Sequence, residues 1–287
     1  MSRTVGPVPD TSGLGAGDHV CWVYADDEDH RAGVTRYFAD GIERGERIVY
    51  VSDHYDEATV VAYLSAAGFA PKRMLEQGSL IVMPACESYP RDEHGYDLDA
   101  TVAQFQAFAQ QAVADGYTGF RVAGESDFLL ETVPQHGLLA YELTADLMVR
   151  EAPMTGMCLY DARHAPMERL GEVAAVHAAA VVASSLAADL PSFRLWASET
   201  ETIGLAGEID FATADTVRQI LMDGAVGRAG VLDLTTLGFA DVAAIRAIAR
   251  VAQAMAGQND RPVIRGAASQ VRFVLSQFEV SSLVFDG

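Results

Sequence analysis

The chain has 287 residues, of which 50% are hydrophobic and 21% are charged, a composition typical of a folded protein with room for two domains. Its formal net charge of −20 argues against direct binding to nucleic acid or to an anionic membrane surface, because both need a basic footprint. Three cysteines are too few for a disulfide framework, and neither a secretory leader nor a membrane-spanning apolar run is evident, which predicts a cytoplasmic protein.

The first 52 residues predict a leader followed by a strand, a loop, a helix and a second strand. Residues 1–16 are rich in glycine, proline and serine and predict a flexible leader. The alternation in HVCWVY predicts a buried strand that begins at His19, and RIVYVS predicts another after a helix from about Ala32 to Ile42. The loop between them carries four acids and no lysine, so it would repel a phosphate group. We therefore expect a nucleotide-binding type of architecture without nucleotide binding and without enzymatic activity.

Polar residues follow several of the predicted strands. The strand GFRVAG delivers Glu125 at its carboxyl end, and the strand GMCLYD ends at Asp161, shortly before His164. In open α/β sheets the carboxyl ends of strands line the ligand crevice. The candidate ligand or sensing residues are His19, Cys21, Tyr24, Arg121, Glu125, Tyr141, Glu142, Tyr160, Asp161 and His164. The alternative is a network of buried polar groups that satisfy one another.

His19 and Cys21 are two residues apart and share one face of the predicted strand, so they could share a ligand, a metal ion or a redox event. Their spacing is not a known zinc pattern, and only Cys86, Cys158 and His164 are available to complete a coordination sphere. A metal ligand, a reactive or ligand-contacting thiol and a simply buried cysteine all remain open. The cofactor, if there is one, is unknown.

A second, smaller α/β domain is predicted after residue 192. The segment Val173–Ala188 suits a packed helix, and residues 189–192 predict a hinge. Strands are then expected at Phe193–Trp196, Thr202–Ala206, Gly230–Leu234 and Val263–Ile264, with helices from Thr213 to about Gly224, from Val242 to about Met255 and from Gln270 to Gln277. Asp241 is the expected cap of the middle helix.

The motifs of the first part together resemble the MEDS domain, a bacterial sensory domain. They are GDHVCWVY, GERIVYVS, GYTGFRVAGES, YELTADL and MCLYDARH. The resemblance implies a domain over residues 17–188 with a core similar to the RecA and KaiC family, a degenerate phosphate loop and a role in sensing a small molecule or a redox state.

The second part, residues 193–287, resembles the STAS domain of anti-sigma factor antagonists. The motifs that carry the resemblance are LAGEIDFATADTV, VLDLTTLGFADVAAI and SQVRFVLSQFEVSSLVF. In that family an Asp-Ser-Ser/Thr-Gly turn is phosphorylated by a kinase, whereas the matching positions here begin Asp241, Val242, Ala243 and lack the acceptor hydroxyl. The resemblance implies a partner-binding surface for an anti-sigma factor or related kinase, formed by Gly207, Asp210, Thr213, Asp241, Val242 and Ala243.

We therefore expect a bacterial signalling protein in which a sensor domain is coupled to a STAS domain that regulates transcription indirectly. One alternative is a non-phosphorylatable scaffold within a larger stress-signalling assembly, and another is a RecA-like nucleotide-binding enzyme. A small-molecule ligand and a homo-oligomer are both possible under the leading interpretation.

Overall fold

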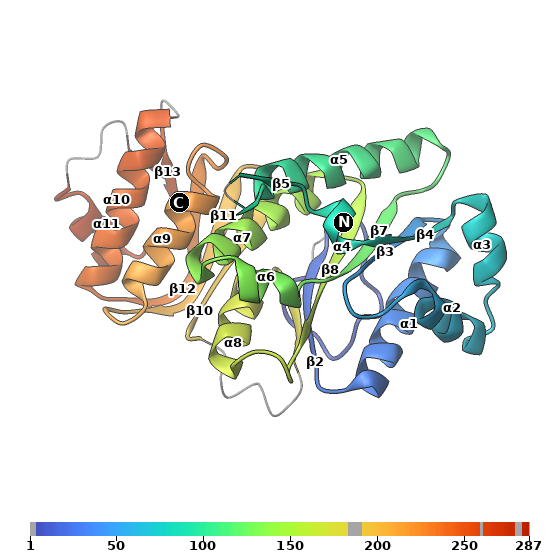
Figure 1. The fold of residues 1–287 in the computed structure, drawn as a ribbon. Helices are drawn as coiled ribbons and strands as arrows, with labels where there is room; N and C mark the ends of the chain where they lie inside the picture. The colour runs from blue at the N-terminus through green and yellow to red at the C-terminus, as the bar shows by residue number, and fades with distance from the viewer. Residues whose placement is uncertain (1–3, 94, 183–190, 259–260, 279–282, 287) are drawn as a thin grey trace. The chain divides into compact units, whose positions relative to one another are not determined.

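The structure is a computed structural model that describes residues 4–93, 95–182, 191–258, 261–278 and 283–286 (Figure 1). The chain forms two compact units. The first comprises Met1–Val133, Met148–Leu170 and Ala179–Asp189, and the second comprises Pro134–Leu147, Gly171–Ala178 and Leu190–Gly287. Two segments from the predicted first domain thus belong to the second compact unit. Among the described residues, no helix is both long enough and apolar enough to cross a membrane.

The first unit contains a seven-stranded sheet in which every neighbouring pair is parallel. In spatial order its strands are β1 (Gly6–Pro7), β9 (Ala179–Val182), β2 (His19–Tyr24), β8 (Met154–Asp161), β7 (Phe120–Glu125), β3 (Arg47–Ser52) and β4 (Leu80–Pro84). All six residues of β2 and of β7 are buried, as expected for central strands of a parallel sheet. The predicted α/β class is confirmed.

Helices cover both faces of this sheet. Helices α1 (Asp27–Arg44) and α2 (Glu57–Ala66) form the core with one face, through residues such as Trp22, Phe38 and Leu64. Helix α5 (Leu98–Ala114) packs on the other face, where the Phe108 ring lies 6.4 Å from the Phe120 ring. The remaining elements are α3 (Pro71–Gln77), α4 (Ala85–Ser88), the hairpin of β5 (Arg91–Asp92) and β6 (Gly95–Tyr96), α6 (Asp127–Thr132), α7 (Gln135–Glu151) and α8 (Met167–Ala175).

Two sequence-based expectations need correction. Residues 4–16 are not a flexible leader, because β1 pairs with β9 and the Leu14 side chain is buried in the core. The segment Val173–Ala188 is not one helix, because α8 ends at Ala175 and Ala179–Val182 pairs with β2 as strand β9. Valine favours strands, and pairing between two strands outweighs the helix preference of the alanines. Residues 183–188 and the first half of the predicted hinge lie outside the described residues.

The second unit contains a five-stranded sheet with the order β10 (Phe193–Glu199), β11 (Thr202–Ile209), β12 (Val231–Ala240), β13 (Val263–Arg265) and β14 (Val284–Asp286). The β10–β11 pair is antiparallel, and the other pairs are parallel. Helices α9 (Ala214–Gly224), α10 (Val242–Gln258) and α11 (Ser269–Leu275) complete the fold. The predicted strands and helices are confirmed, although β12 continues beyond Leu234 to Ala240.

Buried polar contacts hold the early segments of the second unit to this sheet and its helices. The Ala197 backbone N–H on β10 donates a 2.6 Å hydrogen bond to Asp146 Oδ2 on α7. The Arg194 guanidinium on the same strand donates to the carbonyl oxygen of Ala178 at 3.0 Å. A Cβ atom on Gly224 would lie 2.7 Å from the Ala140 carbonyl oxygen, so α7 and α9 approach each other more closely than a side chain permits.

Candidate functional site

The carboxyl edge of the parallel sheet in the first unit gathers polar and aromatic side chains. Strands β2, β7 and β8 end at Tyr24, Glu125 and Asp161, and β3 is followed directly by His54 and Tyr55. Register pairs Tyr24 with Asp161 and Glu125 with Leu159, so these strand ends are neighbours. The sequence-based expectation that Tyr24, Glu125 and Asp161 share one edge follows from parallel pairing and agrees with this register.

Glu125 is fully buried, and its carboxylate accepts hydrogen bonds from several donors. The Tyr50 hydroxyl donates to Oε1 at 2.5 Å, and the backbone N–H groups of Asp53, His54 and Tyr55 donate at 3.1, 2.5 and 3.1 Å. Burial raises the pKa of Glu125, although these four donors act to lower it. The carboxylate therefore fixes the conformation of the β3–α2 loop.

Asp127 and Asp161 are buried neighbours whose pKa values are shifted in opposite directions. Asp127 Oδ1 accepts a 2.9 Å hydrogen bond from the Asp161 backbone N–H, while its Oδ2 atom has no hydrogen-bond partner among the described residues. Burial raises the pKa of Asp127 to about 7. Burial would also raise the pKa of Asp161, but hydrogen bonds from Arg163 outweigh it and lower that pKa. One carboxyl is thus poised to bind or release a proton, and its neighbour stays ionised.

Arg163 links three elements at this edge. Its guanidinium donates to Asp161 Oδ2 at 2.6 Å and to Asp27 Oδ1 at 2.9 Å, on the first turn of α1. The Tyr55 hydroxyl also donates to Asp27 Oδ1, at 2.8 Å. Arg163 is 45% exposed, so solvent screens these ion pairs. Their main consequence is positional, because they hold the acidic loop after β2.

An aromatic cluster lies beneath this layer. The His30 ring is fully buried, stacks on Tyr55 with 3.9 Å between ring centroids, and contacts the Tyr50 hydroxyl at 3.0 Å through Nε2. Burial lowers the pKa of His30 to about 4, so the ring is neutral at physiological pH. The buried Tyr24 hydroxyl, whose ring lies 4.9 Å from His30, has no hydrogen-bond partner among the described residues. Within the described part of the chain, Tyr24 Oη and Asp127 Oδ2 are therefore buried polar atoms at this edge without a hydrogen-bond partner.

His54, Asp127 and His164 each place one potential metal-ligand atom within 4.8 Å of the other two. The two imidazole rings are T-shaped with centroids 5.4 Å apart, and about half of each side chain is exposed. Of these residues, only His164 was among the candidates predicted from the sequence. The rule that strand ends line the crevice points to His54 and Asp127 equally well, since they follow β3 and β7.

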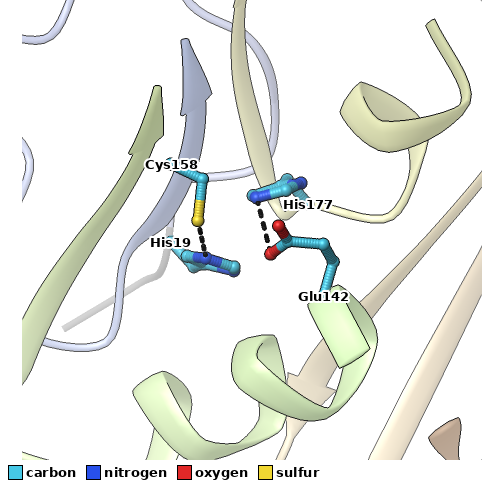
Figure 2. A group of neighbouring side chains, drawn as sticks. All are labelled: His19, Glu142, Cys158 and His177. Atoms are coloured by element: carbon cyan, nitrogen blue, oxygen red, sulfur yellow. Dashed lines mark hydrogen bonds and ion pairs between the residues drawn. The ribbon is translucent and has the colours of Figure 1, made fainter. Parts of the chain in front are cut away.

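Figure 2 shows two of the sequence candidates that lie elsewhere, His19 and Glu142, each beside a second polar side chain. In the first unit, His19 Nε2 at the start of β2 lies 3.3 Å from Cys158 Sγ on β8. In the second unit, His177 Nε2 lies 3.3 Å from Glu142 Oε2 on α7, and both side chains are fully buried. His177 was not predicted as a functional residue. The neighbouring candidate Tyr141 on α7 is also buried.

The sequence candidates His19 and Cys21 do not lie in one crevice with the candidates Glu125 and His164. His19 pairs with Gly156 and Gly156 with Val122, so His19 lies three residues before the level of Glu125, or about 10 Å along the strands. Cys21 is buried on the same sheet face as His19, as predicted, opposite Cys158. Cys86 is exposed on α4, far in sequence from the other two cysteines.

Two other candidates belong to the interior of the first unit. The Arg121 guanidinium is fully buried and donates to Glu46 Oε2 at 2.5 Å and to the carbonyl oxygens of Tyr37 and Leu14. It thus forms the satisfied internal network that was the alternative to a ligand contact. Tyr160 is fully buried one residue before Asp161, so its side chain lies on the opposite face of β8.

The predicted partner-binding residues of the second unit do come together. Asp241 caps α10 by accepting from the Ala244 N–H at 2.9 Å, and its other oxygen accepts from the Phe211 N–H at 2.9 Å. Asp210 accepts from the Thr213 N–H and hydroxyl before α9. Gly207 has a φ of +80° and could not carry a Cβ, which would lie 2.0 Å from the Ser192 carbonyl oxygen. These contacts join the loop before α9 to the start of α10.

This junction is exposed and partly apolar. Phe211 is 80% exposed and Val242 is 55% exposed. A groove of about 220 Å³ runs between α9 and α10, lined by Phe211, Ala214, Asp215, Arg218, Ala243, Arg246, Ala247 and Arg250. We call the surface formed by Asp210, Phe211, Asp241, Val242 and this groove the α9–α10 surface. Its three arginines contrast with the strongly acidic chain.

The fold and these two sites define a protein with a parallel α/β domain, whose polar groups converge on one sheet edge, and a smaller α/β domain with an exposed helix-start surface. Comparison with family models agrees: the model for the MEthanogen/methylotroph, DcmR Sensory domain, MEDS, matches residues 18–178, and the model for the STAS domain matches residues 199–285. The chain belongs to the MEDS family, and its MEDS domain is followed by a STAS domain.

Solved structures with low similarity also match. The crystal structure of the flagellar accessory protein FlaH from Methanocaldococcus jannaschii matches with 11% identity and a TM-score of 0.43, covering 64% of this chain and 73% of that chain. A KaiC-like protein from Pyrococcus horikoshii OT3 matches with 13% identity and a TM-score of 0.39, covering 56% of this chain and 69% of that chain. No curated protein matches the sequence.

Proposed function

We propose that this protein is a bacterial signalling protein in which the MEDS domain responds to a small ligand and thereby changes the affinity of the STAS domain for an anti-sigma factor or a related kinase. Transcription is regulated indirectly, through that partner. The exposed α9–α10 surface is the single observation that carries the proposal. Its exposed Phe211 and Val242 adjoin one groove that arginines line, and an apolar patch with a polar rim is typical of a protein interaction site.

The chemistry of the α9–α10 surface fits a protein partner. An aromatic anchor at Phe211 stands beside an apolar rim at Val242, and the arginines of the groove can pair with carboxylates of the partner. Val242 occupies the position of the phosphorylated hydroxyl in the resembled family. The surface therefore has no phosphate-dependent off state, and regulation must come from elsewhere in the chain.

The contacts of α7 support the MEDS domain as the source of that regulation. Asp146 and Thr144 lie within the MEDS match, and they bond to Ala197 on β10 and to Gly224 at the end of α9. Helix α9 also lines the proposed partner groove. A shift of α7 that follows ligand binding would thus be transmitted to α9 through buried contacts, which have few alternative arrangements.

We also propose that the protein does not hydrolyse nucleotides. Asp26 accepts a hydrogen bond from the Asp29 N–H at 2.9 Å, and Asp29 accepts one from the Ala25 N–H at 3.2 Å. Two N–H groups that could hold a phosphate are therefore bonded to carboxylates, and Asp27 adds a further negative charge.

Binding measurements on the full chain test the proposed function. Candidate anti-sigma factors and kinases of the same genome are titrated against the wild type and against Phe211→Ala, with Phe273→Ala as the matched control. Phe273 is also exposed, at 69%, but lies on α11. We expect one partner to bind the wild type and the control equally, and to lose at least tenfold in affinity for Phe211→Ala. Binding that is unchanged in all three proteins would refute the assignment of this surface.

A further inference from the structure

We infer that His54, Asp127 and His164 bind a divalent transition-metal ion, of the zinc or iron(II) class, at the carboxyl edge of the sheet in the MEDS domain. This inference deepens the proposed function, because it names the chemistry by which that edge takes a ligand. The three potential donor atoms lie within 4.8 Å of one another and come from the ends of three neighbouring strands, β3, β7 and β8.

The Asp127 carboxylate provides the anchor. Its side chain is only 3% exposed, and Oδ1 is fixed by the Asp161 N–H, which leaves Oδ2 without a hydrogen-bond partner among the described residues. A buried oxygen of this kind costs free energy until something binds it. A cation satisfies it directly, whereas a neutral ligand would need a correctly placed donor.

The two histidines have the surroundings of metal ligands. His164 Nδ1 lies 3.8 Å from Asp161 Oδ2, and His54 Nε2 lies 3.4 Å from Asp53 Oδ2. One nitrogen of each ring therefore lies near a carboxylate. A carboxylate behind a ligating imidazole is the usual arrangement at metal sites, since it orients the ring and makes the other nitrogen more basic.

The distances can close around an ion. Donor atoms bound to one zinc ion at about 2.1 Å are about 3–3.5 Å apart, so atoms that lie within 4.8 Å need to move by only about 1 Å. His54 and His164 are about half exposed, and rotation of their side chains can supply this movement. Two imidazoles and one carboxylate favour transition metals over Mg²⁺ or Ca²⁺, and three protein ligands leave an open position for a small ligand.

Cobalt(II) titration of the full chain tests the site. The protein is purified without a histidine tag and stripped with EDTA, and visible ligand-field absorption is followed as Co²⁺ is added, with Zn²⁺ as competitor. We expect one equivalent of Co²⁺ to bind and Zn²⁺ to displace it. His54→Ala and His164→Ala should each weaken binding by more than the roughly 10–100-fold that loss of an outer partner costs. The matched control is His136→Ala, an exposed histidine outside the cluster.

Three results would overturn the inference: no stoichiometric uptake, equal uptake by wild type and both variants, or uptake with a thiolate charge-transfer band, which would assign the ion to cysteine. Circular dichroism of each variant establishes that the fold is intact, which the exposure of both histidines favours. Because this assay requires no protein partner, its failure would leave the proposed partner binding standing. If the protein binds the metal ion but the α9–α10 surface binds no partner, the proposed function is refuted and the metal site stands.

Discussion

Asp146 on α7 accepts a buried 2.6 Å hydrogen bond from the backbone N–H of Ala197 on β10. A side chain of the MEDS domain thus bonds to the backbone of the edge strand of the five-stranded sheet. The first strand of that sheet is thereby tied to α7 independently of the connection through residues 183–190. This relationship makes the stability of β10 depend on a helix that lies far earlier in the chain.

We predict that Asp146→Ala destabilises the protein by about 2–3 kcal/mol, because a hydrogen bond to a charged group is lost and the Ala197 N–H is left buried without that acceptor. Urea unfolding measures the loss. Asp223→Ala, a substitution of an exposed aspartate in α9, is the control and should change stability by less than about 0.5 kcal/mol. Equal free energies of unfolding for the two variants would show that the Asp146 hydrogen bond does not stabilise the protein.

Glu125→Gln should loosen the loop that follows β3. The amide nitrogen of glutamine cannot accept a hydrogen bond. In place of Oε2 it would deprive the N–H groups of Asp53 and His54 of their acceptor. In place of Oε1 it would deprive the Tyr50 hydroxyl and leave the Tyr55 N–H only its 3.4 Å contact, and either loss costs about 1.5–3 kcal/mol. Hydrogen exchange should show faster exchange at His54 and Tyr55 than in the wild type. Glu87→Gln, on the exposed side of α4, serves as control, and unchanged exchange in Glu125→Gln would contradict the role of the carboxylate.

The contribution of His30 to stability should fall as the pH is lowered from about 6.5 to 4. Burial lowers the pKa of this ring to about 4 in the folded state, so in this window the unfolded chain binds the proton that the folded chain excludes. The stabilisation is present above pH 6.5, and on the order of 3 kcal/mol is lost by pH 4. Asp127 has the opposite sign, since its pKa is raised and its contribution is lost as pH rises towards 7.

Comparison with His30→Phe separates these two effects, because Asp127 is present in both proteins. Phenylalanine keeps an aromatic ring against Tyr55 but cannot be protonated. In chemical denaturation at several pH values, the stability of the wild type relative to that of His30→Phe should fall by on the order of 3 kcal/mol between pH 6.5 and 4. If the free energies of unfolding of the two proteins change in parallel with pH, the pKa of His30 is not lowered in the folded state.

Calorimetry with Mg-ATP should detect no binding in the micromolar range, and no phosphate should be released over hours. The reason is the acidic loop, where Asp26 and Asp29 accept the N–H groups of Asp29 and Ala25. Micromolar affinity would show that this loop rearranges around the nucleotide. The carboxyl edge would then be a nucleotide site, which contradicts the prediction.

Much of the fold was predictable, because buried strands and helix starts have local signals. The alternation of HVCWVY and the capping role of Asp241 both agree with the structure. The strand at Ala179–Val182 was missed because its alanines and valines suit a helix as well, and only pairing with β2 decides between them. The distance between His19 and Glu125 along the sheet was missed for a related reason. It depends on the register between strands, which local sequence signals do not determine.

Under the proposed function, the carboxyl edge of the MEDS domain controls the affinity of the STAS domain for its partner. The most direct measurement is the dissociation constant of the identified partner for the full chain, compared among the wild type, Asp127→Asn and Arg163→Ala, with Phe211→Ala as a reference for lost binding. We expect the dissociation constants of the two edge variants to differ from that of the wild type by at least about fivefold, the lower range of allosteric coupling. Edge variants that bind as tightly as the wild type, while Phe211→Ala does not bind, would contradict it.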